Sequence, residues 1–164
     1  MIVIGDALNL SYVPRWSVVP MLKRQTVSDH TYRVMVIYLH LCLVLDTTPN
    51  LVGALLHDVS ECRTGDIPSP AKAHIKQQWP ALETYGAPWK APTVDDPVLV
   101  LADQIEAFTW LEMWANKNTA IYQWAHQNIL SKIGSIIEEM DEFPALRQIV
   151  DGMLDQIIAG MTSA

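Results

Sequence analysis

The sequence is poor in cysteine: Cys42 and Cys62 are its two thiols, and they do not form a Cys-x-x-Cys pair. This argues against a disulfide framework and against a thiolate zinc site, so buried reduced thiols are the simpler interpretation. No apolar run reaches the roughly eighteen residues that a membrane-spanning helix requires. The first residues also lack the basic lead and the apolar stretch of a secretory signal. These absences predict a cytoplasmic protein that does not contact a membrane.

Positive charge is scarce as well. The chain has 11 Lys and Arg residues against 18 Asp and Glu residues, which gives a net charge of -7. Such a balance repels a phosphate backbone, so binding of nucleic acid is not expected. A small anionic substrate remains compatible with it, because a metal ion and a few local cations can invert the field inside a pocket.

The chain lacks internal repeats, low-complexity runs and interdomain linkers, and its 164 residues suit one domain with a single core. We therefore predict one domain over residues 1–164. Strand-like alternation appears only briefly at the start, and residues 1–14 are interpreted as a lead-in segment that ends at Pro14. Helical periodicity dominates the rest, so the predicted fold class is all-α.

The first long helix is expected to begin at Ser28, a preferred N-cap residue, with Asp29 in the first turn. One face of this helix then carries its inward residues at helical spacing: His30, Val34, Ile37, Tyr38, Leu41 and Leu45. A second helix over residues 51–62 is apolar nearly all round, which is typical of a central, buried helix. Residues 64–70 contain Gly65, Pro68 and Pro70 and predict a rigid loop, followed by a short helix over residues 71–78.

Residues 79–97 form the longest irregular stretch, which is either a substrate wall or, as base rates favour, a loop pinned by aromatic burial. Asp95 or Asp96 can cap a helix that has Pro97 at its first position and runs to about residue 116. Further helices are predicted over residues 119–140 and from near Pro144. The apolar stripe of the last helix is assigned to the core or to a subunit interface. The high hydrophobic fraction, 50%, predicts a homo-oligomer.

Metal-ligating side chains stand out on these helices: His30, His57, Asp58 and Asp103. Each alone is more often a hydrogen-bonded core or cap residue. Together they make a mixed nitrogen and oxygen set that suits Mn, Co, Fe, Ni or Zn. Adjacent helix positions diverge by about 100°, so His57 and Asp58 need partners from other helices, which His30 and Asp103 can supply. A metal of this kind lowers the pKa of bound water and polarises a phosphoryl oxygen, so hydrolysis of phosphate esters or anhydrides is the natural reaction.

These residues resemble the ordered H…HD…D signature of the HD-domain metal-dependent phosphohydrolases. Four segments also resemble the bacterial 5'-deoxyribonucleotidase branch, in which they read R-W, V-S-E-H, H-D-A-S-E and T-G-D-L-P-T-P-V-K. Here they are Arg15-Trp16 and residues 27–30, 57–61 and 64–72, with Asp29 in place of the usual Glu. The resemblance covers about residues 14–110 and implies a single HD-domain helical bundle. The segments between the motifs are short, and in this respect the chain resembles compact phage HD phosphohydrolases that remove triphosphate from dATP.

The resemblance implies a role for each residue of the site. Arg15 would contact phosphate and Trp16 would press on C2' of the sugar, although a surface Arg beside a core Trp is the plainer alternative. Glu61 would orient or deprotonate water, and Asp66 would assist protonation, unless they are a solvated helix residue and a turn former. Ile67 and Pro68 are placed to touch a base. Thr64 and Lys72 would contact phosphate.

We therefore expect a metal-dependent phosphohydrolase of 2'-deoxynucleotides, foremost a triphosphohydrolase of the dATP type that releases deoxynucleoside and triphosphate. A 5'-deoxynucleotidase acting on monophosphates is the alternative, and a non-catalytic nucleotide-sensing HD module is a remoter one. The expected cofactor is one divalent transition metal, Co, Mn or Zn, with Mg or additional ions as an option for a triphosphate substrate. The expected setting is the cytoplasm of a bacterium or of a phage-infected host.

Overall fold

The most buried helix is α7, Pro97–Trp114, and the other long helices pack against it. This computed structural model describes residues 4–78, 96–141 and 143–162, and these residues contain helices but no sheet. The other helices are α1 (Ile4–Asn9), a 3-10 helix η1 (Leu10–Tyr12), α2 (Val27–Val44), α3 (Leu51–Leu56), α4 (Glu61–Thr64), α5 (Ser69–Gln78), α8 (Ala120–Glu139) and α9 (Leu146–Thr162). The all-α prediction is confirmed.

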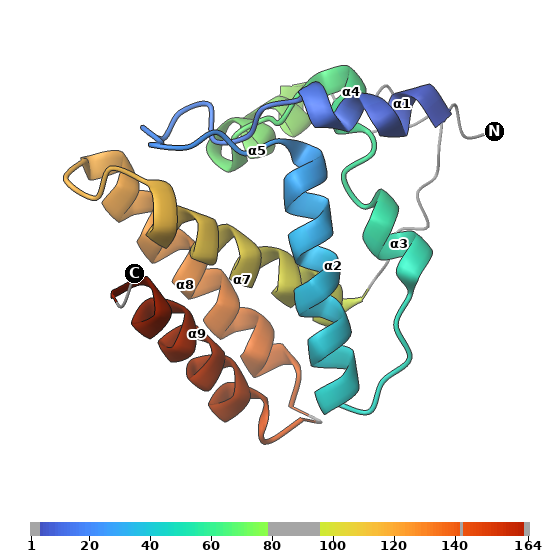
Figure 1. Cartoon of the computed structure of the whole chain (residues 1–164), viewed down its shortest axis with the longest axis vertical. Helices are drawn as coiled ribbons and strands as arrows, with labels where there is room; N and C mark the ends of the chain where they lie inside the picture. The colour runs from blue at the N-terminus through green and yellow to red at the C-terminus, as the bar shows by residue number, and fades with distance from the viewer. Residues whose placement is uncertain (1–3, 79–95, 142, 163–164) are drawn as a thin grey trace.

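Helices α2, α8 and α9 each contact α7 and share one hydrophobic core with it. Figure 1 shows α7, α8 and α9 running side by side while α2 crosses them, with α1, α4 and α5 gathered at one end. Fully buried side chains from α2, α7 and α9, including Leu41, Ile105 and Leu146, meet in this core. Among the described residues, no helix is long and apolar enough to cross a membrane.

The starts of two helices lie where the sequence predicted them, and a side chain caps each one. The Asp96 side chain accepts hydrogen bonds from the backbone N–H groups of Val98 and Leu99, and Pro97 occupies the first turn of α7. The Thr119 side chain caps α8 by accepting from the Tyr122 N–H. The predicted irregular stretch lies outside the described residues, apart from Asp96 and Pro97.

Expectations for two helices were wrong. Thr26, not Ser28, caps α2, because it forms a capping box with Asp29: each side chain accepts from the other residue's backbone N–H. Residues 4–12 of the lead-in segment, for which no helix was predicted, form α1 and η1. The predicted helix over residues 51–62 is divided into α3 and α4, and it is not the central helix, since Leu51, Val52 and Leu55 are 48%, 60% and 53% exposed.

Candidate active site

Four side chains from three parts of the fold converge at one end of α2. His30 lies in α2, Asp103 in α7, and His57 and Asp58 follow α3. The Nε2 atom of His30 is 3.0 Å from Oδ1 of Asp103, 3.5 Å from Oδ2 of Asp58 and 3.4 Å from Nε2 of His57. Asp58 Oδ2 is in turn 3.4 Å from His57 Nε2. The structure therefore brings together all four predicted ligands.

The break between α3 and α4 allows His57 and Asp58 to share this site. The helix ends at Leu56, and residues 57–60 form a turn. Its backbone hydrogen bonds span three residues rather than four, from Val59 N to Leu56 O and from Glu61 N to Asp58 O. From this turn His57 Nε2 and Asp58 Oδ2 both reach His30 Nε2, at 3.4 and 3.5 Å.

The hydrogen bonds of the two imidazoles fit a metal site. His57 Nδ1 lies 2.8 Å from the Ala54 carbonyl oxygen, and His30 Nδ1 lies 2.5 Å from a carboxylate oxygen of Glu106. Both neighbours are acceptors, so each Nδ1 donates its proton, and an imidazole that carries its only proton there presents an Nε2 lone pair to a metal ion. Two lone pairs and two carboxylates then face one another. This donor set suits a divalent transition metal, and His30, His57 and Asp103 lie close enough together to hold one ion.

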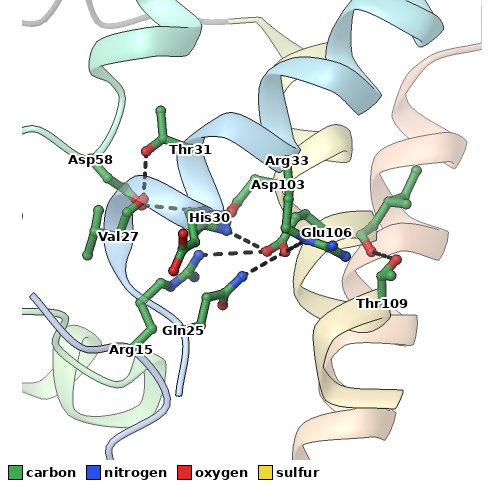
Figure 2. Close-up of polar contacts among 12 residues, drawn as sticks. Arg15, Gln25, Val27, His30, Thr31, Arg33, Asp58, Asp103, Glu106 and Thr109 are labelled. Carbon is green, nitrogen blue, oxygen red and sulfur yellow. Dashed lines mark hydrogen bonds and ion pairs between the residues drawn. The ribbon is translucent and has the colours of Figure 1, made fainter. Parts of the chain in front are cut away.

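Glu106 is a functional candidate that the sequence reasoning missed. Its side chain is fully buried and accepts from Arg33 Nε at 2.7 Å and from Gln25 Nε2 at 2.8 Å, in addition to His30. Figure 2 shows His30 lying between Asp58 and Glu106. Its Nδ1 atom faces Glu106, and its Nε2 atom faces Asp58 and Asp103. The available signal was its position one helical turn after Asp103, on the same face of α7.

Electrostatic coupling to these carboxylates controls the charge of His30. Burial and the Arg15 charge lower the pKa of His30, but hydrogen bonds to Asp103 and Glu106 outweigh them and raise it to about 9. Burial also opposes ionisation of Asp103 and Glu106, yet their bonds to His30 bring the pKa of both below the usual range. Without a metal ion, a proton on His30 therefore balances the negative charge of these carboxylates.

A pocket of about 160 Å³ opens beside this cluster. The predicted catalytic and substrate-binding residues other than Thr64 line it: Arg15, Trp16, Glu61, Asp66, Ile67, Pro68 and Lys72. Asp58 and Asp103 reach its wall from the metal cluster. Thr64 is not among the lining residues, and its hydroxyl donates to the backbone carbonyl oxygens of Ser60 and Gly65.

Arg15 brings a buried positive charge with unused donors to the pocket. Its nearest carboxylate atoms, Asp66 Oδ2 and Glu106 Oε2, are both 3.9 Å away, too far for hydrogen bonds. Its buried Nε and Nη1 atoms have no hydrogen-bond partner in the part of the chain that the structure describes. Burial lowers the pKa of Arg15, but the charges of Asp58 and Asp103 raise it further, so the guanidinium stays protonated. Unused donors of this kind fit phosphate oxygens.

Trp16 lies next to Arg15 in an unusual backbone conformation, with φ at 62°. Asp66 holds this conformation by accepting a hydrogen bond from the Trp16 backbone N–H at 3.2 Å. The indole Nε1–H donates to Oε1 of Gln25 at 2.8 Å. Asp66 therefore positions the residue beside the substrate pocket, in addition to lining it.

Glu61 combines burial with an unused oxygen. Its Oε2 atom has no partner among the described residues, and its Oε1 atom lies 3.5 Å from Lys72 Nζ. Burial raises the pKa of Glu61, the charges of Asp58 and Asp66 raise it further, and the pKa reaches about 8. A carboxyl group whose pKa lies near neutral pH is suited to proton transfer.

One wall of the pocket comes from α8, to which the sequence reasoning gave no role. Trp124, Asn128 and Lys132 line the pocket at intervals of four residues along one face of α8. The sequence signal was this spacing of an aromatic, an amide and a cation. It could be used only once the face of α8 that meets the pocket was known.

A solved structure shows the class of fold. The cyanophage S-2L HD phosphohydrolase DatZ, bound to dA and one catalytic Zn2+ ion, matches with a TM-score of 0.70 at 18% identity, covering 100% of this chain and 99% of that one. The fold is therefore that of the HD-domain phosphohydrolases. Residues 5–87 match a family model described as 5'-deoxynucleotidase YfbR-like. This is half of the chain, and the chain belongs to that YfbR-like family.

Two curated phage proteins are similar in sequence, and both are dATP triphosphohydrolases. The protein of Acinetobacter phage SH-Ab 15497 is 33% identical over 88 residues, which cover 44% of this chain and 43% of that protein. The protein of Salmonella phage PMBT28 is 29% identical over 124 residues, which cover 65% of this chain and 64% of that protein. The chain thus spans less than two thirds of the length of the relatives that it matches.

We predict that Glu106→Gln weakens metal binding roughly 10- to 100-fold, because His30 loses the carboxylate that fixes its tautomer and raises its basicity. The measurement is Zn2+ affinity by competition with a chromophoric chelator. Glu112→Gln is the matched control, since Glu112 lies in the same helix but pairs with Lys117 and Tyr122. Wild-type affinity in folded Glu106→Gln protein would contradict the role given to Glu106.

Proposed function

We propose that this chain is a metal-dependent phosphohydrolase of 2'-deoxynucleotides that converts a substrate of the dATP type to deoxynucleoside and triphosphate. The observation that carries the proposal is the buried Arg15 guanidinium, which has unused donors and belongs to a residue lining the same pocket as two of the metal-ligand candidates. An anion receptor beside a metal site suits the hydrolysis of a phosphate ester. The two similar dATP triphosphohydrolases support the choice of substrate.

His30, His57, Asp58 and Asp103 would hold the metal, with Co, Mn or Zn favoured by the mixed imidazole and carboxylate set. When bound, it supplies Lewis-acid polarisation of the phosphoryl group and a lowered pKa for water. Mg or additional ions remain an option with a triphosphate. The Zn2+ ion named for DatZ supports zinc among these choices.

The protein's own residues divide the remaining tasks. Arg15 binds the phosphoryl oxygens, and Trp16 closes the space that a 2'-hydroxyl group would need. Glu61 accepts a hydrogen bond from the attacking water at its unused Oε2 atom and takes its proton. Asp66 assists protonation of the leaving group while it holds Arg15 and Trp16. Ile67 and Pro68 contact the base, and Lys72 contacts phosphate.

The number of phosphates separates the two leading functions. Lys72 and Lys132 line the pocket in addition to Arg15, and three cations suit a triphosphate better than a monophosphate. The family description favours the alternative, a 5'-deoxynucleotidase acting on monophosphates. A non-catalytic nucleotide sensor explains less, since all four metal-ligand candidates and Glu61 are present. The site of action would be the cytoplasm of a bacterium or of a phage-infected cell.

The first prediction for this function concerns products. Metal-loaded protein incubated with each deoxynucleoside mono- and triphosphate should release triphosphate and deoxyadenosine from dATP, as identified by chromatography. Asp58→Ala should lose both metal and turnover, because it removes a ligand, whereas Asp155→Ala on the exposed face of α9 should lose neither. Phosphate release from dAMP alone would favour the 5'-nucleotidase. Absence of turnover with every deoxynucleotide would reject the enzyme.

The second prediction concerns the sugar. Trp16→Ala should lower the ratio of kcat/KM for dATP over ATP by about tenfold or more, because the wall against the 2'-hydroxyl is removed; tenfold is about 1.4 kcal/mol. Tyr12→Ala, which truncates an exposed aromatic side chain, is the control. An unchanged ratio in Trp16→Ala would contradict the proposed contact with C2'.

We also propose that the protein forms a homo-oligomer through the outer face of α2. Exposed apolar side chains occupy one stripe of this helix, opposite its buried face: Tyr32, Val36, Leu39 and Leu43. Leu43 is 80% exposed, so Leu43→Lys should leave the fold intact and lower the mass measured by light scattering. Leu22→Lys, at a site 79% exposed outside the helices, should not change the mass. A monomeric wild-type protein would exclude this assembly.

A further inference from the structure

A buried amide joins the two halves of the candidate site. Gln25 lies just before α2 and is fully buried. Its Oε1 atom accepts from Trp16 Nε1–H at 2.8 Å, and its Nε2 group donates to Glu106 Oε1 at 2.8 Å. Figure 2 shows the Gln25 side chain reaching Glu106 beside Arg15. The sequence reasoning gave Gln25 no role.

The chemistry of the two neighbours fixes the orientation of this amide. The indole N–H can only donate a hydrogen bond, and an ionised carboxylate can only accept one. Rotation of the amide by half a turn would therefore place donor against donor and acceptor against acceptor. Gln25 is thus held in a single orientation, and in that orientation it fixes the position of the indole N–H.

Two further hydrogen bonds hold Glu106, the acceptor of the Gln25 amide. Arg33 Nε donates to the same Oε1 atom at 2.7 Å, and His30 Nδ1 bonds the other oxygen at 2.5 Å. His30 is a metal-ligand candidate, so one carboxylate orients both the ligand and, through Gln25, the indole. This chain of hydrogen bonds sets the distance between the metal site and the Trp16 indole, the proposed wall against the sugar.

Trp16 needs such support because its backbone is in the left-handed region, with φ at 62°, where residues other than Gly, Asn and Asp are uncommon. Asp66 fixes the backbone by accepting from its N–H, and Gln25 fixes the far edge of the indole. Backbone strain of this kind persists where the surroundings over-determine the position of a residue.

We infer that Gln25 is a positioning residue for deoxyribose selectivity, which it sets by holding the Trp16 indole against the sugar. The inference rests on the proposed contact between Trp16 and C2'. A role limited to filling the core predicts a different outcome, since loss of Gln25 would then lower stability and leave the preference for deoxyribose unchanged.

Gln25→Met tests this, because it keeps the length of the side chain and removes both hydrogen bonds. Trp16→Phe removes the same indole bond from the other end. In each variant the ratio of kcat/KM for dATP over ATP should fall roughly three- to tenfold, the range expected for one buried hydrogen bond. The ratio of their equilibrium dissociation constants should change in the same direction, while bound metal stays at the wild-type level.

The double variant and a matched control sharpen the result. Gln25→Met combined with Trp16→Phe should lose no more selectivity than Trp16→Phe alone, because both substitutions break the same hydrogen bond between the indole and the amide. Gln127→Met, at an exposed position of α8 outside the pocket, should keep the wild-type ratio. If the loss of selectivity in the double variant equals the product of the two single losses, the two residues act independently, and the inference is overturned.

Other outcomes separate this inference from the proposed function. A wild-type ratio in folded, metal-retaining Gln25→Met overturns the role of Gln25 alone, provided that wild-type protein prefers dATP. Wild-type protein that binds dATP and ATP equally overturns the sugar wall and this inference together. If Gln25→Met does not fold, Trp16→Phe decides, because an unchanged ratio there removes any role for the indole bond.

Discussion

The buried carboxylate of Glu106 is the constraint on which the rest of the site depends. An ionised carboxylate without solvent contact is tolerated only when donors surround it. Here the donors come from His30 and Arg33 of α2 and from Gln25 just before it, while Glu106 itself belongs to α7. The polar network therefore joins the pair of helices that also meet most extensively through apolar contacts. Packing and site geometry are fixed at the same place.

This arrangement explains how an acidic protein can offer an attractive site to an anion. The carboxylates of Asp58, Asp66, Asp103 and Glu106 keep the Arg15 guanidinium protonated despite burial. None of them takes up its Nε and Nη1 donors in a hydrogen bond. A net charge of -7 repels polymers of phosphate at long range, whereas a buried cation with unused donors is the kind of group that attracts a single phosphate locally.

Features encoded by local chemistry were predictable, and features that depend on packing were not. The cap at Asp96 needs only neighbouring residues, and the sequence offered it as one of two candidates, with the start of the helix at about Thr119 also predicted. The end of α3 at Leu56 carries no such signal, because no Gly or Pro follows it before Gly65. Glu106 and the α8 wall were missed for a related reason: spacing shows that residues share a face, but tertiary structure decides what that face meets.

Both motif dipeptides depend on an interruption of regular structure. Adjacent residues point about 100° apart on a helix and to opposite faces of a strand, so neither geometry directs both members of a pair into one site. His57 and Asp58 lie in the turn that follows α3, and both reach Nε2 of His30. Arg15 and Trp16 both line the pocket at a point where the chain adopts a positive φ at Trp16, stabilised by Asp66. The local cost of each irregularity is offset by tertiary hydrogen bonds, which is why motif and fold must be read together.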